Sequence, residues 1–384
     1  MKIAIFTNNY LPNPYGVTGS IESFRKEFEK MGHTVYIFAP FSKGYVDENP
    51  RVYRFPSIDL NYKISFPLAI PYSYKIGRIL DKLEIDIIHS QHPNLLGWEA
   101  KRWAKKKNIP LVFTWHTLYD QYAHFAPLIP EKIAAWWTIK NATAYANKAD
   151  QVVTPTNSVK EIIRNWGVKN ENLIAIPTGV EEIFFENSKR DEMRSNLGIK
   201  KDEIALLLLS RITTEKNLIF LAKAVSEVLR RNEKIKFILA GEGSELENMK
   251  EIFMQNKTQD KVVYLGIVNA QEKKNIYAAG DIFVFSSKSE TQGMIISEAM
   301  YMGLPVVALD APGIKDLVAN QVTGLLVKEE KESFVSAVER LIGDESLRIK
   351  FSENAKKLAK NDLTATSSAI KMLEVYKKAI SRKK

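Results

Sequence analysis

Short apolar runs recur along the whole chain, with longer stretches of helical character between them. Each run is continuously apolar, a pattern that predicts strands buried on both faces of a parallel sheet. The first series of runs comprises Ile3–Phe6, Val35–Phe38, Ile85–His89, Leu111–Thr114, Gln151–Thr154 and Leu173–Ile176. The second series comprises Ile204–Leu209, Ile235–Ala240, Val262–Leu265, Ile282–Phe285, Val306–Leu309 and Leu325–Val327. Because strand, helix and strand alternate through both series, we predict two doubly wound α/β domains.

The boundary between the two domains is predicted at Pro177-Thr178-Gly179-Val180, where a Pro/Gly signal ends the first series. This gives a first domain of residues 1–180 and a second of residues 181–363. The final helical stretch, about residues 364–384, follows no further strand and has no obvious sheet partner in the second domain. We therefore expect it to pack back on the first domain.

Composition narrows the class of protein. The 384 residues include no Cys, which excludes a disulfide scaffold, a thiolate nucleophile and a zinc–cysteine site. The 45% hydrophobic fraction is that of a globular protein. The chain begins with a core-type strand, and no apolar run approaches 18 residues, so neither a signal peptide nor a membrane-spanning helix is expected.

The net charge of +10 is unevenly distributed along the chain. Residues 1–180 carry 22 basic and 15 acidic groups, residues 181–360 carry 27 and 28, and the last 24 residues carry 6 and 2. The excess of positive charge therefore lies in the first half and the tail, which favours an anionic surface as a partner.

The first candidate site is the segment 13–20, between the first strand and its helix. Gly16 and Gly19 allow close backbone approach, and Ser20 is placed to cap a helix whose N-terminus attracts anions. A flexible turn followed by a helix cap explains the segment equally well. It does not match a G-x-x-x-x-G-K-[ST] loop, which disfavours a P-loop nucleotidase.

The second candidate site is the segment 210–217, directly after the most apolar strand. Arg211 and Lys216 lie where a loop opens a helix, and two cations with helix-terminal amides can clamp a diphosphate. A solvated charged turn is the alternative. Gly241-Glu242-Gly243, after the next strand, is first of all a tight turn and lacks the third glycine of a dinucleotide fingerprint.

The third candidate site is the segment 286–300, in which seven residues separate Glu290 from Glu298. Gly293 allows the loop to turn into a helix whose first amides, Met294 to Ile296, are available to a ligand. A carboxylate before that helix can accept hydrogen bonds from sugar hydroxyls, and one two turns later can reach a ribose diol. Two unrelated surface glutamates are the alternative.

These motifs, in this order, resemble those of the retaining glycosyltransferases of family 4. The segment 290–298 resembles the family's Glu-x7-Glu motif, Arg211 and Lys216 match its diphosphate-binding cations, and Gly16-Val17 matches its first-loop glycine. The stretch from Gly303 to Val307 is similar to its usual structural strand. The resemblance runs from residue 1 to about residue 380. It implies the GT-B architecture, two facing Rossmann-like domains, with acceptor bound by the first domain and a nucleotide-sugar donor by the second.

Histidines follow two strands of the first domain. In the segment 113–120, His116 is similar to the family's active-site histidine, which contacts the donor sugar. A lone histidine at a strand end is otherwise a core or capping residue. The spacing of His89 and His92 suggests a metal pair, but His89 is better explained as the end of its strand, and the chain contains no D-x-D triple. Cations at the diphosphate do the work of a metal ion, so we expect metal-independent catalysis without a cofactor.

The acceptor is predicted to be a lipid. The segment 116–120 with Tyr122 resembles the bacterial diacylglycerol glucosyltransferases, which are monotopic and favour anionic membranes. Aromatic and basic residues are interleaved in residues 51–78 and from the apolar segment 125–130 to Trp136-Trp137, a combination suited to a membrane interface. The basic run in residues 101–107 would add to such a patch. Ordinary helix packing and solvated helix faces are the alternatives.

Together these features predict a cytoplasmic, peripheral or monotopic enzyme that moves a hexose, glucose from UDP-glucose, to a lipid such as diacylglycerol. The catalytic residues are predicted to be His116, Arg211, Lys216 and Glu290. The donor-binding residues are predicted to be Gly16, Val17, Arg211, Lys216, Gly241, Ile267, Gly293, Met294, Ile295, Ile296 and Glu298. The acceptor-binding residues are predicted to be Tyr119 and Tyr122.

Two other functions fit the sequence. One is a soluble family-4 enzyme acting on a sugar phosphate, a small alcohol or a polysaccharide. The other is a non-catalytic binding protein that uses the basic half, for example on nucleic acid, although no nucleic-acid motif supports it.

Overall fold

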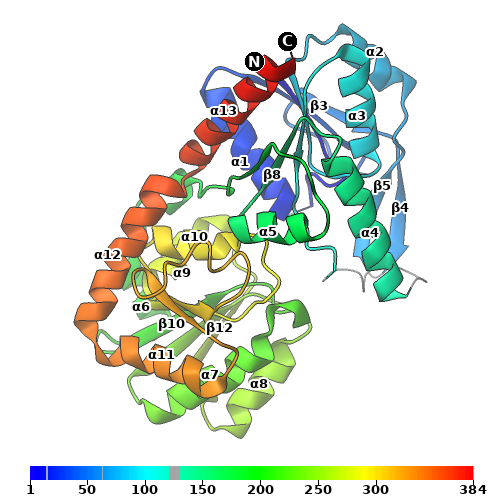
Figure 1. Cartoon of the computed structure of the whole chain (residues 1–384). Coiled ribbons are helices and arrows are strands. Elements are labelled where there is room, and N and C mark those ends of the chain that lie inside the picture. The colour runs from blue at the N-terminus through cyan, green and yellow to red at the C-terminus, as the bar shows by residue number, and fades with distance from the viewer. Residues whose placement is uncertain (14–15, 63, 121–129, 384) are drawn as a thin grey trace. The chain divides into compact units, whose positions relative to one another are not determined.

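The computed structural model describes residues 1–13, 16–62, 64–120 and 130–383, which form two compact units (Figure 1). Unit 1 contains Met1–Gly179 together with the segment from Ala365 onward, and unit 2 contains Val180–Thr364. The chain passes between the units at two points that lie side by side, since the Val180 N–H donates to the Leu363 carbonyl at 2.7 Å. The observed division lies within one residue of the division expected from the sequence.

Unit 1 is built on a seven-stranded parallel sheet of order β3-β2-β1-β6-β7-β8-β9. The strands are β1 (Lys2–Phe6), β2 (Thr34–Pro40), β3 (Val52–Phe55), β6 (Ile87–Ser90), β7 (Leu111–Thr114), β8 (Gln151–Thr154) and β9 (Leu173–Ala175). A separate antiparallel hairpin is formed by β4 (Ser57–Tyr62) and β5 (Ile64–Ala69). The strand order reverses between β1 and β6, and ligands of open α/β sheets bind at the carboxyl ends of strands at such a point.

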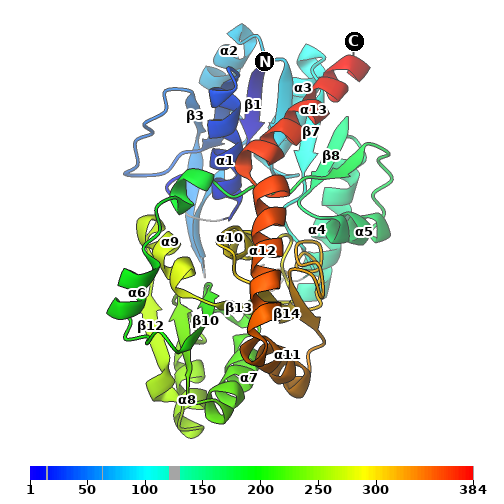
Figure 2. The ribbon, with the colours of Figure 1, turned by 90° about the vertical axis from the view of Figure 1, so that its left-hand side faces the viewer.

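Helices cover both faces of this sheet (Figures 1 and 2). They are α1 (Gly16–Lys30), α2 (Tyr74–Lys82), α3 (Leu96–Lys107), α4 (Glu131–Ala146), α5 (Asn157–Asn165) and α13 (Ala365–Lys383). One core cluster joins α1 and α13 to the sheet, and another joins α2, α3, α4 and α5 to its opposite face.

The C-terminal helix α13 packs against α1. The rings of Phe28 and Tyr376 lie 5.6 Å apart, and the Thr366 hydroxyl donates to Glu27 at 2.9 Å. This confirms the prediction that the final helix returns to the first domain.

Unit 2 is built on a six-stranded parallel sheet of order β12-β11-β10-β13-β14-β15. The strands are β10 (Ile204–Leu209), β11 (Ile235–Ala240), β12 (Val262–Gly266), β13 (Ile282–Phe285), β14 (Val306–Leu309) and β15 (Gly324–Val327). The helices are α6 (Arg190–Asn196), α7 (Leu218–Arg231), α8 (Leu246–Gln255), α9 (Ala270–Ala279), α10 (Met294–Tyr301), α11 (Lys331–Gly343) and α12 (Glu345–Asp362).

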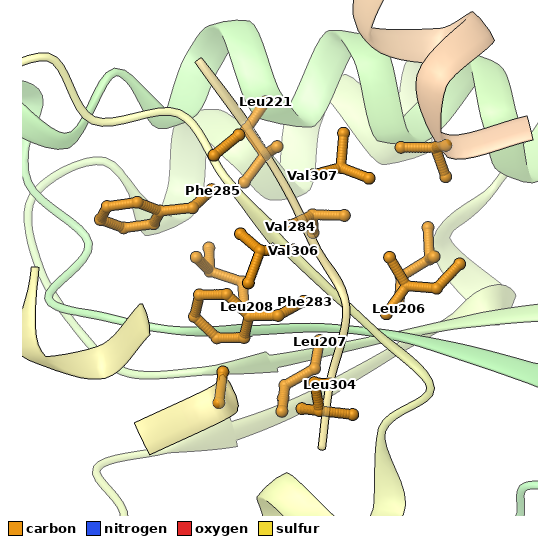
Figure 3. Close-up of a cluster of buried hydrophobic side chains, with 14 of the residues drawn as sticks. Leu206, Leu207, Leu208, Leu221, Phe283, Val284, Phe285, Leu304, Val306 and Val307 are labelled. Atoms are coloured by element: carbon orange, nitrogen blue, oxygen red, sulfur yellow. The ribbon is translucent and has the colours of Figure 1, made fainter. Parts of the chain in front are cut away.

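The middle of the unit 2 sheet is buried on both faces. Side chains of β10, β13 and β14 form one apolar core, in which Leu206, Leu207 and Leu208 are inaccessible to solvent (Figure 3). This double burial explains why the strand is continuously apolar in sequence. The predicted fold class, two doubly wound Rossmann-like α/β domains, is confirmed.

Within the part of the chain that the structure describes, no helix has both the length and the apolar character needed to cross a membrane.

Candidate functional site

The carboxyl ends of β10 and β13, at the point where the unit 2 strand order reverses, bring Lys216 and Glu290 together. The Lys216 ammonium donates to Glu290 Oε1 at 2.5 Å, and the two side chains are only 11% and 14% exposed. A charge removed from water is costly unless it is paired, so the ammonium and the carboxylate each offset the cost of burying the other.

Hydrogen bonds between neighbouring loops hold this pair in place. Lys216 ends a 3₁₀ turn, Thr214–Lys216, and the Ser286 hydroxyl after β13 lies within hydrogen-bond distance of the Lys216 and Asn217 carbonyls, at 3.1 and 3.0 Å. The Ser289 hydroxyl donates to the Glu215 carbonyl at 3.1 Å. The loop that carries Glu290 is therefore fastened to the loop that carries Lys216.

Arg211 lies on the same loop as Lys216 but outside this ion pair. Its side chain is 59% exposed and pairs with Glu215, four residues later, at 3.2 Å. An exposed pair of this kind is weak, so the guanidinium is available to an anionic ligand.

Glu298 lies on α10, which begins directly after Gly293. Gly293 has φ +79°, a left-handed conformation that favours glycine, and the first turn of the helix is Met294, Ile295 and Ile296. The Glu298 carboxylate accepts hydrogen bonds from Lys273 and from Tyr277, both on α9. Neither α9 residue was singled out in the sequence, because nothing there indicates which carboxylate they contact.

The glycine turn after β11 packs backbone against backbone. A β-carbon on Gly241, which has φ +136°, would lie 1.8 Å from the Ser210 carbonyl oxygen, so a larger residue does not fit. The Gly241 N–H donates to the Gly266 carbonyl at 2.7 Å, and Ile267, the next residue, is 78% exposed. The turn thus joins the loops after β10 and β12 at the same edge of the sheet.

The corresponding edge of unit 1 holds histidines rather than charged pairs. His116, just after β7, contacts Gln91 through Nε2 and Oε1 at 2.7 Å. Burial lowers the pKa of His116 to about 3, so its imidazole is neutral near pH 7. A neutral imidazole can donate one hydrogen bond and accept another, and because Gln91 engages Nε2, the other ring nitrogen is the one that suits a sugar hydroxyl.

His89 belongs to a buried polar chain that sequence analysis did not predict. Its Nδ1 lies 2.6 Å from the Tyr376 hydroxyl of α13, and its Nε2 lies 2.7 Å from the Thr114 hydroxyl at the end of β7. Both ring nitrogens are therefore engaged within the protein. This contact supports the interpretation of His89 as a strand residue over that of a metal ligand paired with His92.

One expectation for the first loop needs correction. Ser20 does not cap α1, because the helix begins at Gly16 and Ser20 lies within it, where its hydroxyl bonds to that of Thr178 at 2.7 Å. A β-carbon on Gly16 would meet no described protein atom within 4 Å, so packing within the protein does not require glycine there, and the close approach of a ligand stays a prediction. Val17, the next residue, packs against the core between α1 and the sheet.

Of the two predicted acceptor residues, Tyr119 lies among the described residues and Tyr122 does not. Tyr119 packs edge-on against the buried Trp115, with ring centroids 5.6 Å apart, and burial raises the pKa of its hydroxyl. Tyr122 lies outside the described residues, as does the segment 125–129.

Large aromatic side chains are exposed on α3, on α4 and around the start of α2. Trp136 and Trp137 of α4 are 59% and 54% exposed, and the Lys140 ammonium lies 4.7 Å from the Trp136 ring centroid. Trp98, Tyr72 and Tyr74 are also exposed. Ordinary packing does explain other members of the predicted patches: Phe55 is buried, and Tyr53 stacks on Phe38.

Comparison with known proteins gives matches over both units. The model described as "Glycosyltransferase Family 4" matches residues 14–182, and that described as "Glycosyl transferases group 1" matches residues 189–358.

The chain is 33% identical over 353 residues to an alpha-monoglucosyldiacylglycerol synthase of Streptococcus pneumoniae, covering 89% of this chain and 78% of that protein. It is 29% identical over 323 residues to the enzyme of the same name from Acholeplasma laidlawii, covering 80% of each. Among solved structures, sucrose-phosphate synthase from Thermosynechococcus elongatus is similar, with a TM-score of 0.80, 18% identity and 99% of each chain covered. At that identity the last similarity concerns the fold alone.

Proposed function

The chain belongs to glycosyltransferase family 4, and we propose that it transfers a hexose from a nucleotide sugar to the hydroxyl group of a membrane lipid, with retention of anomeric configuration. The proposed donor is UDP-glucose and the proposed acceptor is diacylglycerol. The similarity to two alpha-monoglucosyldiacylglycerol synthases supports both choices.

The observation that carries the proposal is the buried ion pair of Lys216 and Glu290 at the switch point of unit 2. When a nucleotide sugar reacts, negative charge grows on the departing diphosphate, and stabilising that charge is the largest electrostatic task of the reaction. Lys216 and the exposed Arg211 supply two positive groups on one loop for it. Glu290, released from Lys216, is left to accept hydrogen bonds from the sugar.

These two cations also support a reaction that needs no metal ion. A divalent cation in such a transfer would neutralise the diphosphate, and the two side chains already provide that charge. His116, neutral near pH 7, would bind a hydroxyl of the transferred sugar, and Glu298 would bind the ribose.

The exposed aromatic side chains of α3 and α4 support a membrane partner. Tryptophans beside lysines suit the region where lipid headgroups meet acyl chains, because the rings are amphipathic and the cations attract anionic lipids. Trp136, Trp137 and Lys140 form such a group on one helix.

The test is a donor panel assayed on vesicles. UDP-, GDP- and ADP-hexoses are each incubated with anionic vesicles that contain diacylglycerol, and the product lipid is identified by mass spectrometry. We expect a hexosyl-diacylglycerol from UDP-glucose, an α-anomeric coupling constant in its NMR spectrum, and an unchanged rate in excess EDTA.

Other outcomes separate the alternatives. Transfer to a sugar phosphate or small alcohol, with none to lipid, would identify the soluble class of family member. A β-linked product would exclude retention, and loss of activity in EDTA with recovery in magnesium would exclude metal-independent catalysis.

A further inference from the structure

Glu298 is held by two side chains from one face of α9. Tyr277 follows Lys273 by four residues, so both project from the same side of the helix. The Tyr277 hydroxyl donates to Glu298 Oε2 at 2.8 Å, and it lies 3.2 Å from the Ile295 carbonyl one turn earlier on α10. The Lys273 ammonium contacts both Glu298 oxygens and lies 2.5 Å from Oε1.

Neither contact can easily rearrange. Tyr277 is inaccessible to solvent, and its ring packs against Phe185 and Phe283 with centroids 6.0 and 6.1 Å away. Burial, with Glu298 beside it, raises the pKa of the Tyr277 hydroxyl, which therefore stays protonated and remains a donor. The Lys273 and Glu298 side chains are 26% and 12% exposed, so their ion pair is partly shielded from water.

The two contacts engage both oxygens of the carboxylate. A carboxylate has about four lone-pair positions, two on each oxygen. Tyr277 donates to Oε2 and Lys273 donates to Oε1, so each oxygen accepts one of these two hydrogen bonds. These two bonds leave one further acceptor position on each oxygen, which suits the two neighbouring hydroxyls of a ribose.

We infer that Lys273 and Tyr277 are positioning residues that fix Glu298 so that its carboxylate accepts hydrogen bonds from the hydroxyls of the donor's ribose. This rests on the proposed function, in which Glu298 binds that ribose. The pair accordingly determines how strongly the site distinguishes a ribonucleotide from a deoxyribonucleotide, and it does so for any base.

The test compares the affinity of a nucleoside diphosphate with that of its 2′-deoxy analogue, by calorimetric titration of the full chain. The base is the one that binds best among UDP, GDP and ADP. For the unaltered protein we expect the ribose form to bind at least tenfold more tightly, because a hydrogen bond to a charged acceptor is lost with the hydroxyl.

Three substitutions are compared with the unaltered protein for their preference for the ribose form. Tyr277→Phe and Lys273→Met should each reduce the ribose preference to about twofold, whereas Lys273→Arg should retain most of it. Lys274→Met is the matched control: Lys274 is the next residue on α9 but donates to the Glu186 carbonyl at 2.8 Å, and its loss should leave the preference unchanged.

The outcomes are distinguishable. If Tyr277→Phe and Lys273→Met bind nucleotide yet keep the full preference, Glu298 does not depend on them and the inference is wrong. If Tyr277→Phe does not fold, the ribose preference of Lys273→Met tests the inference by itself, because Lys273 is partly exposed. If the unaltered protein binds none of the three diphosphates, the proposed function fails, and this inference fails with it.

Discussion

The two units present opposite chemistry at equivalent edges of their sheets. In unit 2 the loops after β10 and β13 hold the buried ion pair of Lys216 and Glu290, and α9 and α10 hold the partly buried pair of Lys273 and Glu298. In unit 1 the end of β6 and the loops after β6 and β7 hold the imidazoles of His89, His92 and His116, whose pKa values burial lowers to between about 3 and about 4. All five histidines of the chain lie between residues 33 and 124, none of them in unit 2. The same fold thus offers charge at one edge and neutral hydrogen-bonding groups at the other, which fits a diphosphate for the first and hydroxyl groups for the second.

The largest effect is expected from removing the central cation of unit 2. Lys216→Ala should lower kcat by about 100- to 1000-fold, the usual cost of deleting one group that stabilises developing charge. Steady-state transfer assays measure this, with Lys223→Ala as the control, since Lys223 is exposed on α7 of the same unit. Activity within threefold of the unaltered protein would refute the role of Lys216.

The next effect tests how the backbone holds Glu290. Gly313 has φ +79°, and a β-carbon there would lie 2.4 Å from the Glu290 carbonyl oxygen. Gly313→Ala should therefore reduce the free energy of unfolding of unit 2 by about 1–3 kcal/mol, and activity with it. Gly343→Ala is the control, because a β-carbon on Gly343 meets no atom within 4 Å. Equal stability of the two variants in urea would show that the Glu290 loop tolerates displacement.

A third effect should appear in unit 1 alone, on acidification. The pKa of His89 is about 3 in the folded protein and about 6.5 in an unfolded chain, so the unfolded state binds the extra proton between these values. The stabilisation is complete above pH 6.5 and is lost as the pH falls, by about 1.4 kcal/mol per pH unit.

Amide hydrogen exchange at pH 7, 6 and 5 should consequently show unit 1 opening more readily in acid while unit 2 changes little. His89→Gln removes the titrating group but keeps a donor and an acceptor for Tyr376 and Thr114, so its pH dependence should be shallower. An unaltered slope in that variant would mean that His89 is not responsible.

The smallest effect concerns the outer surface of unit 1. Replacing both Trp136 and Trp137 with Ser should weaken binding to anionic vesicles about fivefold, through loss of apolar contact with the lipid. The matched control replaces Ile183 and Phe184, an exposed apolar pair in unit 2, with Ser. Vesicle co-sedimentation measures both. If the two double variants behave alike, membrane binding is not specific to α4.

The sequence predicted the buried strands almost to the residue, because double burial demands a continuous apolar run. β10 matches its predicted run, Ile204–Leu209, at both ends. β3 was missed because it is an edge strand whose Arg54 pairs with Asp47, so the apolar run is interrupted. The β4–β5 hairpin was missed as well, and its second strand contains a proline, which weakens a strand signal.

In the candidate site, too, the sequence indicated some features and not others. Arg211, Lys216, Glu290 and Glu298 were singled out because their local spacing carries the motif. Contacts made by distant segments gave no such signal: Lys216 and Glu290 are 74 residues apart, and His89 and Tyr376 are 287 apart. Pairings of this kind arise only when the sheet brings strand ends together, so a single sequence carries no signal that predicts them.

The return of α13 to unit 1 has a consequence for biosynthesis. Unit 2 is one continuous segment, so it can fold as soon as it leaves the ribosome. Unit 1 lacks the cover over one face of its sheet until α13 has been made, after the whole of unit 2. Until then Ile3 and Val35 lack the α13 side chains of their core cluster, and the His89 imidazole lacks the Tyr376 hydroxyl that it contacts. The half of the protein that is synthesised first is therefore expected to be the half that matures last.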